Sequence, residues 1–206
     1  MKYAIPSPDT ILPACRVIPV VVVHREEETD GMLRAFRDGG VGCVEITFRT
    51  DCAAAAIRRA AASFPDMCIG AGTVITGEQA ETAISCGASF IVSPGFSDDV
   101  ATVCSDRSIP YLPGCVTPTE IMHALSCGIT TVKFFPADVY GGLSAIKALS
   151  APFPQVKFLP TGGIGFDNLN DYLSCGKVVA VGGSFLCHGD IRANCLRLSE
   201  ILHSEV

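Results

Sequence analysis

Short runs of apolar residues recur along this chain at near-regular intervals, and glycine or proline bounds most of them. Runs of this length and setting are typical of buried strands. The pattern predicts strands at residues 17–23, 43–48, 68–71, 90–93, 111–113, 131–135, 157–160 and 178–181. Between them it predicts helical stretches such as 31–37, 53–64, 79–85, 120–126 and 143–149.

Local signals mark where several of these helices begin and end. Two pairs have the spacing of capping boxes, Thr76 with Gln79 and Thr117 with Glu120. A Ser-Cys-Gly triplet closes three helical stretches just before a strand, at residues 85–87, 126–128 and 174–176. We expect the glycine of each triplet to adopt the left-handed conformation with which many helices end.

The alternation of strands and helices predicts one domain, residues 1–206, with an α/β fold. Eight strand–helix units in so short a chain favour a compact (β/α)8 TIM barrel. An open doubly wound sheet is the alternative, although no G-x-G-x-x-G motif follows the first predicted strand. In both folds the reacting groups gather at the carboxyl ends of the strands.

The charge of the chain narrows its range of partners. The net charge is −6, and no run of basic residues is longer than the pair Arg58 and Arg59. We therefore expect no binding to nucleic acid or to an anionic membrane through a broad basic face. No apolar run approaches the roughly 20 residues of a membrane-spanning helix. An anionic small molecule is still compatible with this composition, because one or two local cations suffice to bind it.

The cysteines and histidines do not form a recognisable metal-binding pattern. Eleven cysteines are spread along the chain without a C-x-x-C pair, and the four histidines are scattered. We therefore expect no zinc framework and no metal. An odd number of cysteines, in a chain that we expect to lack a secretory signal, predicts free thiols in the reducing cytoplasm.

The predicted strand at 43–48 alternates between two kinds of side chain. Val44, Ile46 and Phe48 share one face, and Glu45, Thr47 and Arg49 share the other. In a barrel the apolar set packs under the helices, so the carboxylate and the guanidinium point inward. A structural ion pair is one interpretation. Because a buried pair adds little stability of its own, we favour a functional role.

The predicted strand at 131–135 carries Lys133 between apolar residues. Lysines are rarely buried without a reason. Desolvation penalises the charged ammonium, and the neutral amine is the nucleophile that Schiff-base chemistry requires. A snorkelling or ion-paired structural lysine is the alternative.

Adjacent glycines mark the ends of the last two predicted strands. Gly162 and Gly163 follow Thr161, and Gly182 and Gly183 precede Ser184. Paired glycines let backbone N–H groups approach an anion, a serine hydroxyl adds a donor, and TIM barrels often bind phosphate in these two loops. Ordinary turn glycines are the alternative.

Two further residues are candidates on weaker signals. Thr73, at the end of the segment GAGT (70–73), could hydrogen-bond a substrate carboxylate. His188 lies just past Ser184 and could approach the mouth of a barrel, although its spacing does not mark it as a catalytic base.

Seven segments, in order along the chain, resemble one enzyme family. They are VEITFRT (44–50), GAGTV (70–74), SPG (93–95), TPTE (117–120), KFFPA (133–137), PTGGI (160–164) and VGGS (181–184). The chain resembles the bacterial 2-keto-3-deoxy-6-phosphogluconate (KDPG) aldolases, which often also act on 4-hydroxy-2-oxoglutarate. The glycine segments are common to many phosphate-binding barrels, whereas the lysine segment together with the Glu–Arg segment is specific.

The resemblance implies a class I aldolase that needs no cofactor, acts on a small 2-oxo acid and forms a cytoplasmic homotrimer. It implies that Lys133 forms a Schiff base at C2 and that Glu45 is the general acid and base. The substrate ligands that it implies are Arg49 and Thr73 for the carboxylate, Phe135 beside the imine, Thr161 for a hydroxyl, and Gly162, Gly163, Gly183 and Ser184 for the phosphate. The products would be pyruvate and D-glyceraldehyde 3-phosphate, or pyruvate and glyoxylate from 4-hydroxy-2-oxoglutarate.

Two other functions remain open on the residues alone. Another enzyme on a phosphate-binding barrel, such as an isomerase or a thiamine-phosphate-type synthase, would use Lys133 as a fixed cation without a covalent adduct. A non-catalytic subunit that binds a phosphometabolite would show no turnover, although the intact set of Glu45, Arg49 and Lys133 speaks against it. The tail after His188 matches no motif, and we assign it no role.

Overall fold

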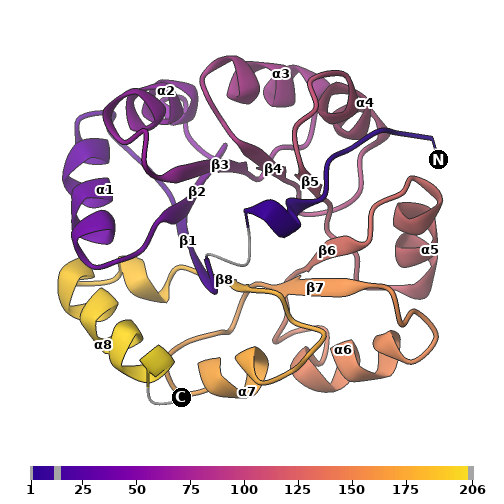
Figure 1. Cartoon of the computed structure of the whole chain (residues 1–206). Helices are drawn as coiled ribbons and strands as arrows, with labels where there is room; N and C mark the ends of the chain where they lie inside the picture. The colour runs from indigo at the N-terminus through magenta and orange to yellow at the C-terminus, as the bar shows by residue number, and fades with distance from the viewer. Residues whose placement is uncertain (1, 12–14, 204–206) are drawn as a thin grey trace.

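The strands of the chain form the wall of a barrel in the computed structural model, which describes residues 2–11 and 15–203 (Figure 1). They are β1 (Val17–Val21), β2 (Cys43–Thr47), β3 (Cys68–Gly72), β4 (Phe90–Val92), β5 (Tyr111–Leu112), β6 (Thr131–Phe134), β7 (Lys157–Pro160) and β8 (Val181–Gly183). Parallel pairing joins them in the order β5-β4-β3-β2-β1-β8, and β6 pairs with β7.

Isolated bridges close this sheet into a ring. Gly114, just after β5, pairs with Lys133 of β6. Phe158 and Thr161 pair with Val178 and Gly182, which joins β7 to the β8 side. The expected TIM barrel is therefore confirmed, and the open doubly wound alternative is wrong for this chain.

Helices surround the barrel on its outside (Figure 1). They are α1 (Glu28–Asp38), α2 (Ala53–Ser63), α3 (Gly77–Ser85), α4 (Asp98–Asp106), α5 (Pro118–Ser126), α6 (Gly142–Ser150), α7 (Leu169–Leu173) and α8 (Ile191–His203). The prediction started α1 at residue 31 because its first turn is polar. Acidic residues in a first turn are favoured by the helix dipole, and Glu28 and Asp30 occupy that turn.

The tail after His188, to which no role was assigned, proves to be structural. It folds as α8 and buries Cys195 and Leu198. A Cβ added at Gly39, the residue that follows α1, would lie 2.3 Å from Cβ of Cys195. The tail therefore packs closely on α1 and completes the ring of helices.

Three local predictions need correction. The strand predicted at 178–181 begins at Val181, because Val178 makes only an isolated bridge to β7 before the chain pairs with β1. Gln79 accepts from the N–H of Ile75 instead of Thr76, so only the Thr117–Glu120 box is complete. Of the three triplet glycines, Gly87 and Gly128 have left-handed φ angles of 103° and 84°, but Gly176 does not.

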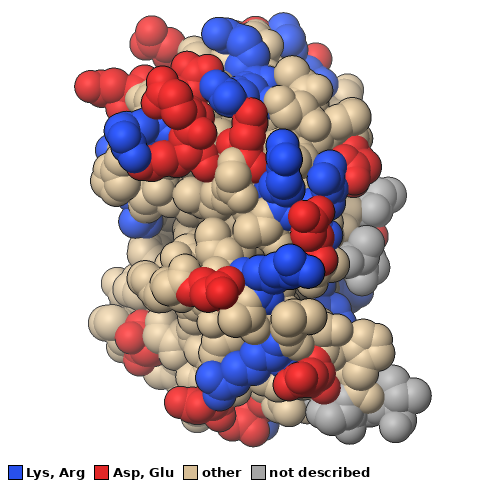
Figure 2. Space-filling model, turned by 90° about the vertical axis from the view of Figure 1, so that its left-hand side faces the viewer, with Lys and Arg blue, Asp and Glu red and all other residues tan. Residues whose placement is uncertain are grey.

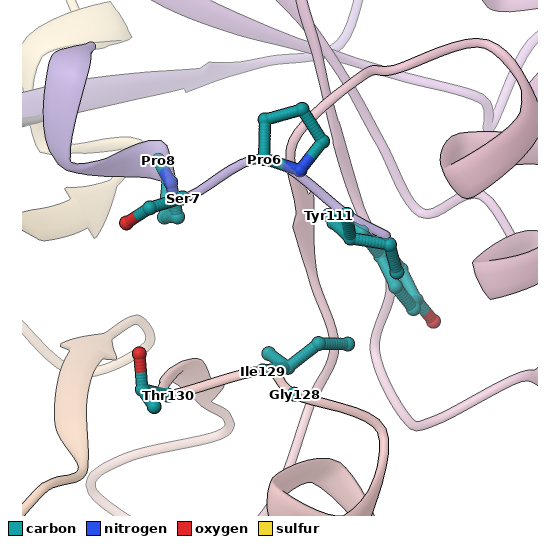
Figure 3. Close-up of a pocket in the computed structure, with 8 residues that line it drawn as sticks. Pro6, Ser7, Pro8, Tyr111, Gly128, Ile129 and Thr130 are labelled. Atoms are coloured by element: carbon teal, nitrogen blue, oxygen red, sulfur yellow. The ribbon is translucent and has the colours of Figure 1, made fainter. Parts of the chain in front are cut away.

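The inside of the barrel is filled toward its amino-terminal end. A cluster of buried apolar side chains lies there, made of Cys15, Ile18, Cys43, Phe90, Val92, Leu112, Leu159 and Ala180. Ile11, next to the short 3-10 helix η1 (Pro8–Thr10), packs against this cluster. Nearby, a cavity of about 60 Å³ separates the segment 5–8 from the starts of β5 and β6 (Figure 3). Larger internal space is left at the carboxyl ends of the strands.

Charges of both signs alternate on the face over α1, α2 and α8 (Figure 2). Arg59 pairs there with Asp30 at 2.8 Å, and Arg25 with Glu28 at 2.7 Å. This face is not broadly basic, as expected from the sequence. Within the described residues, no helix is long and apolar enough to cross a membrane.

Candidate active site

A cavity of about 380 Å³ opens at the carboxyl ends of β1, β6, β7 and β8. Lys133 and Thr161 line its buried part, together with the apolar side chains of Val20 and Ile164. Arg49, Gly163, Ser184 and His188 lie at its exposed rim. The structure thus brings residues from distant segments into one site at the end of the barrel that both candidate folds predicted.

Lys133 and Glu45 form a buried ion pair. Nζ of Lys133 donates to Oε1 of Glu45 at 3.2 Å, and the two side chains are 6% and 1% exposed. Both strands present these side chains inward, as the alternation along β2 predicted for Glu45. Desolvating a buried pair of this kind costs free energy, and removing one partner strongly destabilises the folded protein because the other charge stays buried. The fold therefore holds an amine beside a carboxylate despite the free energy needed to desolvate both charges.

Glycines on β3 make room for this pair. A Cβ added at Gly72 would lie 2.0 Å from Oε1 of Glu45, and one at Gly70 would enter the ring of Phe90. Side chains at these positions would displace the carboxylate or the aromatic ring beneath it. Gly70 and Gly72 thus leave the space that the side chains of Phe90 and Glu45 occupy.

Two buried polar atoms in the site have no hydrogen-bond partner among the described residues. They are Oε2 of Glu45 and Oγ1 of Thr161. Unpaired buried polar atoms are costly and rare. Thr161 reaches its position because Gly182 lacks a side chain there, where a Cβ would lie 2.4 Å from Oγ1. Thr161 lines the cavity, so its Oγ1 is available to a polar ligand there, whereas Glu45 is connected to the cavity through its contact with Lys133.

Phe135 lies beside the amine. Nζ of Lys133 is 5.3 Å from the centre of the Phe135 ring, within the range of a cation–π contact. The ring also lines the cavity. An apolar wall next to the amine limits its contact with water.

The glycine loop after β7 has a fixed shape. Gly162 and Gly163 have φ angles of 98° and 67°, which side-chain-bearing residues rarely adopt. Nδ2 of Asn168 donates to the carbonyl of Gly163, and its Oδ1 accepts from the N–H of Gly165, both at 2.9 Å. Asn168 was not identified from the sequence, because its role depends on a loop conformation that no local motif specifies.

Arg49 and Thr73 meet at the rim. Nε of Arg49 donates to Oγ1 of Thr73 at 3.2 Å. Thr73 has a φ angle of 58°, unusual for a β-branched residue. Arg49 lines the cavity, whereas Thr73 touches it only through Arg49. Thr73 is thus placed to orient the guanidinium.

Sequence reasoning missed the apolar wall that Val20, Val22 and Ile164 provide. A signal was present, because Ile18, Val20 and Val22 alternate along one face of the first strand. His188 was considered and left without a catalytic role, but it lines the cavity beside Ser184.

Elsewhere, one group could hold a metal within the described residues. Ligand atoms of Asp98 at the start of α4, His123 on α5 and Cys127 directly after α5 lie within 4.8 Å of one another. The carboxylate of Asp98 already accepts from Lys2 and Tyr3. This group joins two helices, so spacing along the sequence did not reveal it.

The comparisons with known proteins agree with this geometry. Residues 9–200 match the model of the family described as KDPG and KHG aldolase. The chain belongs to this family. It is 46% identical to the 2-dehydro-3-deoxy-phosphogluconate aldolase of Treponema pallidum over 83% of this chain and 81% of that protein. It is 40% identical to the KHG/KDPG aldolase of Escherichia coli K12 over 92% and 89% of the two chains.

A solved structure of a family member adds chemical information. The KDPG aldolase of Legionella pneumophila, with pyruvate captured as a covalent carbinolamine, is 37% identical to this chain. The TM-score is 0.88, with 97% of this chain and 98% of that chain covered. In that relative, pyruvate was therefore captured as a covalent intermediate.

Proposed function

We propose that this protein is a class I aldolase that cleaves 2-dehydro-3-deoxy-6-phosphogluconate into pyruvate and D-glyceraldehyde 3-phosphate. We include 4-hydroxy-2-oxoglutarate, which lacks the phosphate, as a second substrate that yields pyruvate and glyoxylate. The observation that carries the proposal is the buried amine of Lys133 held 3.2 Å from the carboxylate of Glu45 at the base of an open cavity.

In the proposed reaction, Glu45 first takes a proton from the ammonium of Lys133. The neutral Nζ then attacks the C2 carbonyl and passes one of its protons to the carbonyl oxygen, which gives a carbinolamine. Glu45 gives a proton to the departing hydroxyl, which leaves as water, and an iminium remains. Glu45 then takes the proton of the C4 hydroxyl, and the C3–C4 electrons move into the iminium as the aldehyde forms. Protonation of the resulting enamine at C3 and hydrolysis of the iminium release pyruvate and restore the amine.

The remaining side chains have binding roles in this proposal. Arg49, oriented by Thr73, holds the carboxylate at the pyruvate end, and Phe135 packs beside the iminium. Thr161 binds a substrate hydroxyl through its otherwise unpaired Oγ1. The backbone N–H groups of Gly162, Gly163 and Gly183, with the hydroxyl of Ser184, bind the phosphate.

Borohydride trapping tests the proposal. The protein is incubated with pyruvate and sodium borohydride, and the modified peptide is identified by mass spectrometry. We expect a reduced pyruvate adduct on Lys133 and none in a Lys133→Ala variant. Lys147→Ala, which removes an exposed lysine of α6, is the matched control and should keep the adduct. Folded wild-type protein that stays unmodified at Lys133 would remove the aldolase and leave the isomerase, synthase or binding-subunit alternatives.

We also propose that this chain forms a homotrimer in the cytoplasm. The family resemblance supports the trimer, and the free cysteines support a reducing compartment. Sedimentation equilibrium should give the mass of three chains of 21.6 kDa each. A mass equal to one chain across the micromolar range would exclude the trimer.

A further inference from the structure

His188 lies at the phosphate end of the proposed site. It lines the 380 Å³ cavity together with Gly162, Gly163 and Gly183. Its Nε2 is 3.4 Å from Oγ of Ser184. Among the described residues that line this cavity, the basic ones are Arg49, Lys133 and His188. Lys133 is paired with Glu45, and Arg49 with Thr73. His188 is the basic residue that contacts Ser184, in the segment 182–184.

The backbone around His188 is held in place. Nδ2 of Asn194, on α8, donates to the carbonyl of His188 at 2.7 Å and to that of Leu186 at 3.2 Å. The preceding turn is η3 (Phe185–Cys187), whose Phe185 ring packs edge-on against Phe166 with centres 5.0 Å apart. The anchored backbone fixes the position from which the exposed ring can reach a ligand.

The side chain of His188 has the chemistry of an anion ligand. An imidazole supplies an N–H donor in either protonation state and a positive charge when protonated.

We propose that His188 is a phosphate ligand that gives this aldolase its preference for phosphorylated over unphosphorylated substrates. This inference rests on the proposed function, because the phosphate is that of the proposed substrate. Nε2 of His188 and Oγ of Ser184 together bind one side of the phosphate, opposite the N–H groups of the loop after β7. His188 does not act on the bonds that break.

Paired kinetics with two substrates test this role. We expect His188→Ala to lower kcat/KM for 2-dehydro-3-deoxy-6-phosphogluconate about tenfold, the usual effect of losing a hydrogen bond to a charged group. The loss should appear mainly in KM. For 4-hydroxy-2-oxoglutarate, kcat/KM should stay within about twofold. His188→Asn, which keeps a donor, should recover part of the loss. His203→Ala, at the far end of α8, is the control and should match the wild type with both substrates.

Binding of inorganic phosphate gives a readout that does not depend on turnover. By isothermal titration calorimetry, His188→Ala should raise the dissociation constant of phosphate about tenfold, with unchanged affinity in His203→Ala. Equal losses on both substrates, or unchanged phosphate affinity, would overturn the role of His188. Absence of the pyruvate adduct on wild-type Lys133 would instead overturn the aldolase, and the phosphate titration would still decide whether His188 binds the anion.

Discussion

Glu45, on β2, is positioned by groups on β3 and β6. Its Oε1 accepts from Lys133 of β6, Gly72 of β3 leaves space for it, and its Oε2 has no partner among the described residues. The side chain is 1% exposed. A carboxylate in this setting has one oxygen engaged by the nucleophile and one available to move a proton.

A Glu45→Gln variant separates these two functions. The amide keeps the size of the side chain and a carbonyl that can accept from Lys133, but it cannot carry a proton between atoms. We expect kcat to fall about 10²–10⁴-fold, the usual share of general acid–base catalysis, and the melting temperature to fall as well, because the ammonium of Lys133 loses its buried counter-charge. Steady-state kinetics and a melting curve measure both, with Glu200→Gln, on the exposed surface of α8, as the control. Unchanged kcat in Glu45→Gln would exclude the proposed proton transfers.

Gly72→Ala tests whether the position of Glu45 depends on space on β3. The added Cβ would lie 2.0 Å from Oε1, and a displacement of about 1 Å at a reacting group can cost ~100-fold in rate. The overpacking should also cost about 1–3 kcal/mol of stability, seen in urea denaturation. Gly95→Ala is the control, because a Cβ there meets no atom within 4 Å. Equal activity of the two variants would contradict the interpretation.

How well the sequence predicts a residue's role depends on where its partners lie. The burial of Lys133 and the inward placement of Glu45 were predicted because a charge among apolar residues, or on the inward face of a strand, is visible locally. Asn168 was missed because its bonds depend on the conformation of the loop after β7. The effect of Gly72 was missed because Glu45, which needs the space, lies on another strand. Thr73 was predicted to bind the substrate carboxylate; it accepts a hydrogen bond from Arg49, and its contact with substrate stays a prediction.

Among the elements, α5 has the clearest local start. The side chain of Thr117 accepts from the N–H of Glu120, and that of Glu120 accepts from the N–H groups of Thr117 and Val116. These bonds satisfy backbone donors that the first helical turn leaves free. The sequence predicted this start because the box lies within four consecutive residues.

Thr117→Ala should therefore destabilise the protein without affecting catalysis. We expect a loss of about 1 kcal/mol in the free energy of unfolding, measured from the urea midpoint. Thr119→Ala, at an exposed position of the same helix, should be neutral or slightly stabilising, since alanine favours helices. Equal stability of the two variants would show that the box contributes nothing measurable.

The sequence predicted which strands and helices are present better than the residues at which they begin and end. The last strand starts at Val181 because its ladder is with β1, a partner far away in the sequence. The tail forms α8 because two buried residues, Cys195 and Leu198, find a surface on α1 and the barrel. Both outcomes depend on closure of the ring, which local periodicity does not contain.

Taken as a whole, the molecule distributes its thiols unevenly between environments. At the amino-terminal end of the barrel, Cys68 is partly exposed, and hydrogen bonds from Cys43 and Ser89 lower its pKa to about 7. Burial raises the pKa of Cys104 and of Cys115 to about 12. The thiolate is the reactive form, so these thiols should react at very different rates.

Brief treatment of the native protein with iodoacetamide tests this difference. A lowered pKa means that Cys68 becomes thiolate as the pH rises through about 7, and its labelling should increase over that range. Cys104 and Cys115 should stay unlabelled below pH 9 and react only in urea. Peptide mapping by mass spectrometry shows the order in which the cysteines are labelled. Labelling of Cys104 before Cys68 would contradict the assigned environments.

The filled amino-terminal end of the barrel has a consequence for turnover. Since the cluster of apolar side chains, with Ile11 packed against it, fills that end, substrate enters and both products leave through the mouth where Ser184 and His188 lie. Lys133 stands at the inner end of this passage, so the fragment bound to it is enclosed until the outer one has gone. The proposed reaction therefore has a compulsory sequence of departure, aldehyde first and pyruvate second. In reverse, pyruvate has to bind before the aldehyde, and an aldehyde that arrives first blocks the path to the amine.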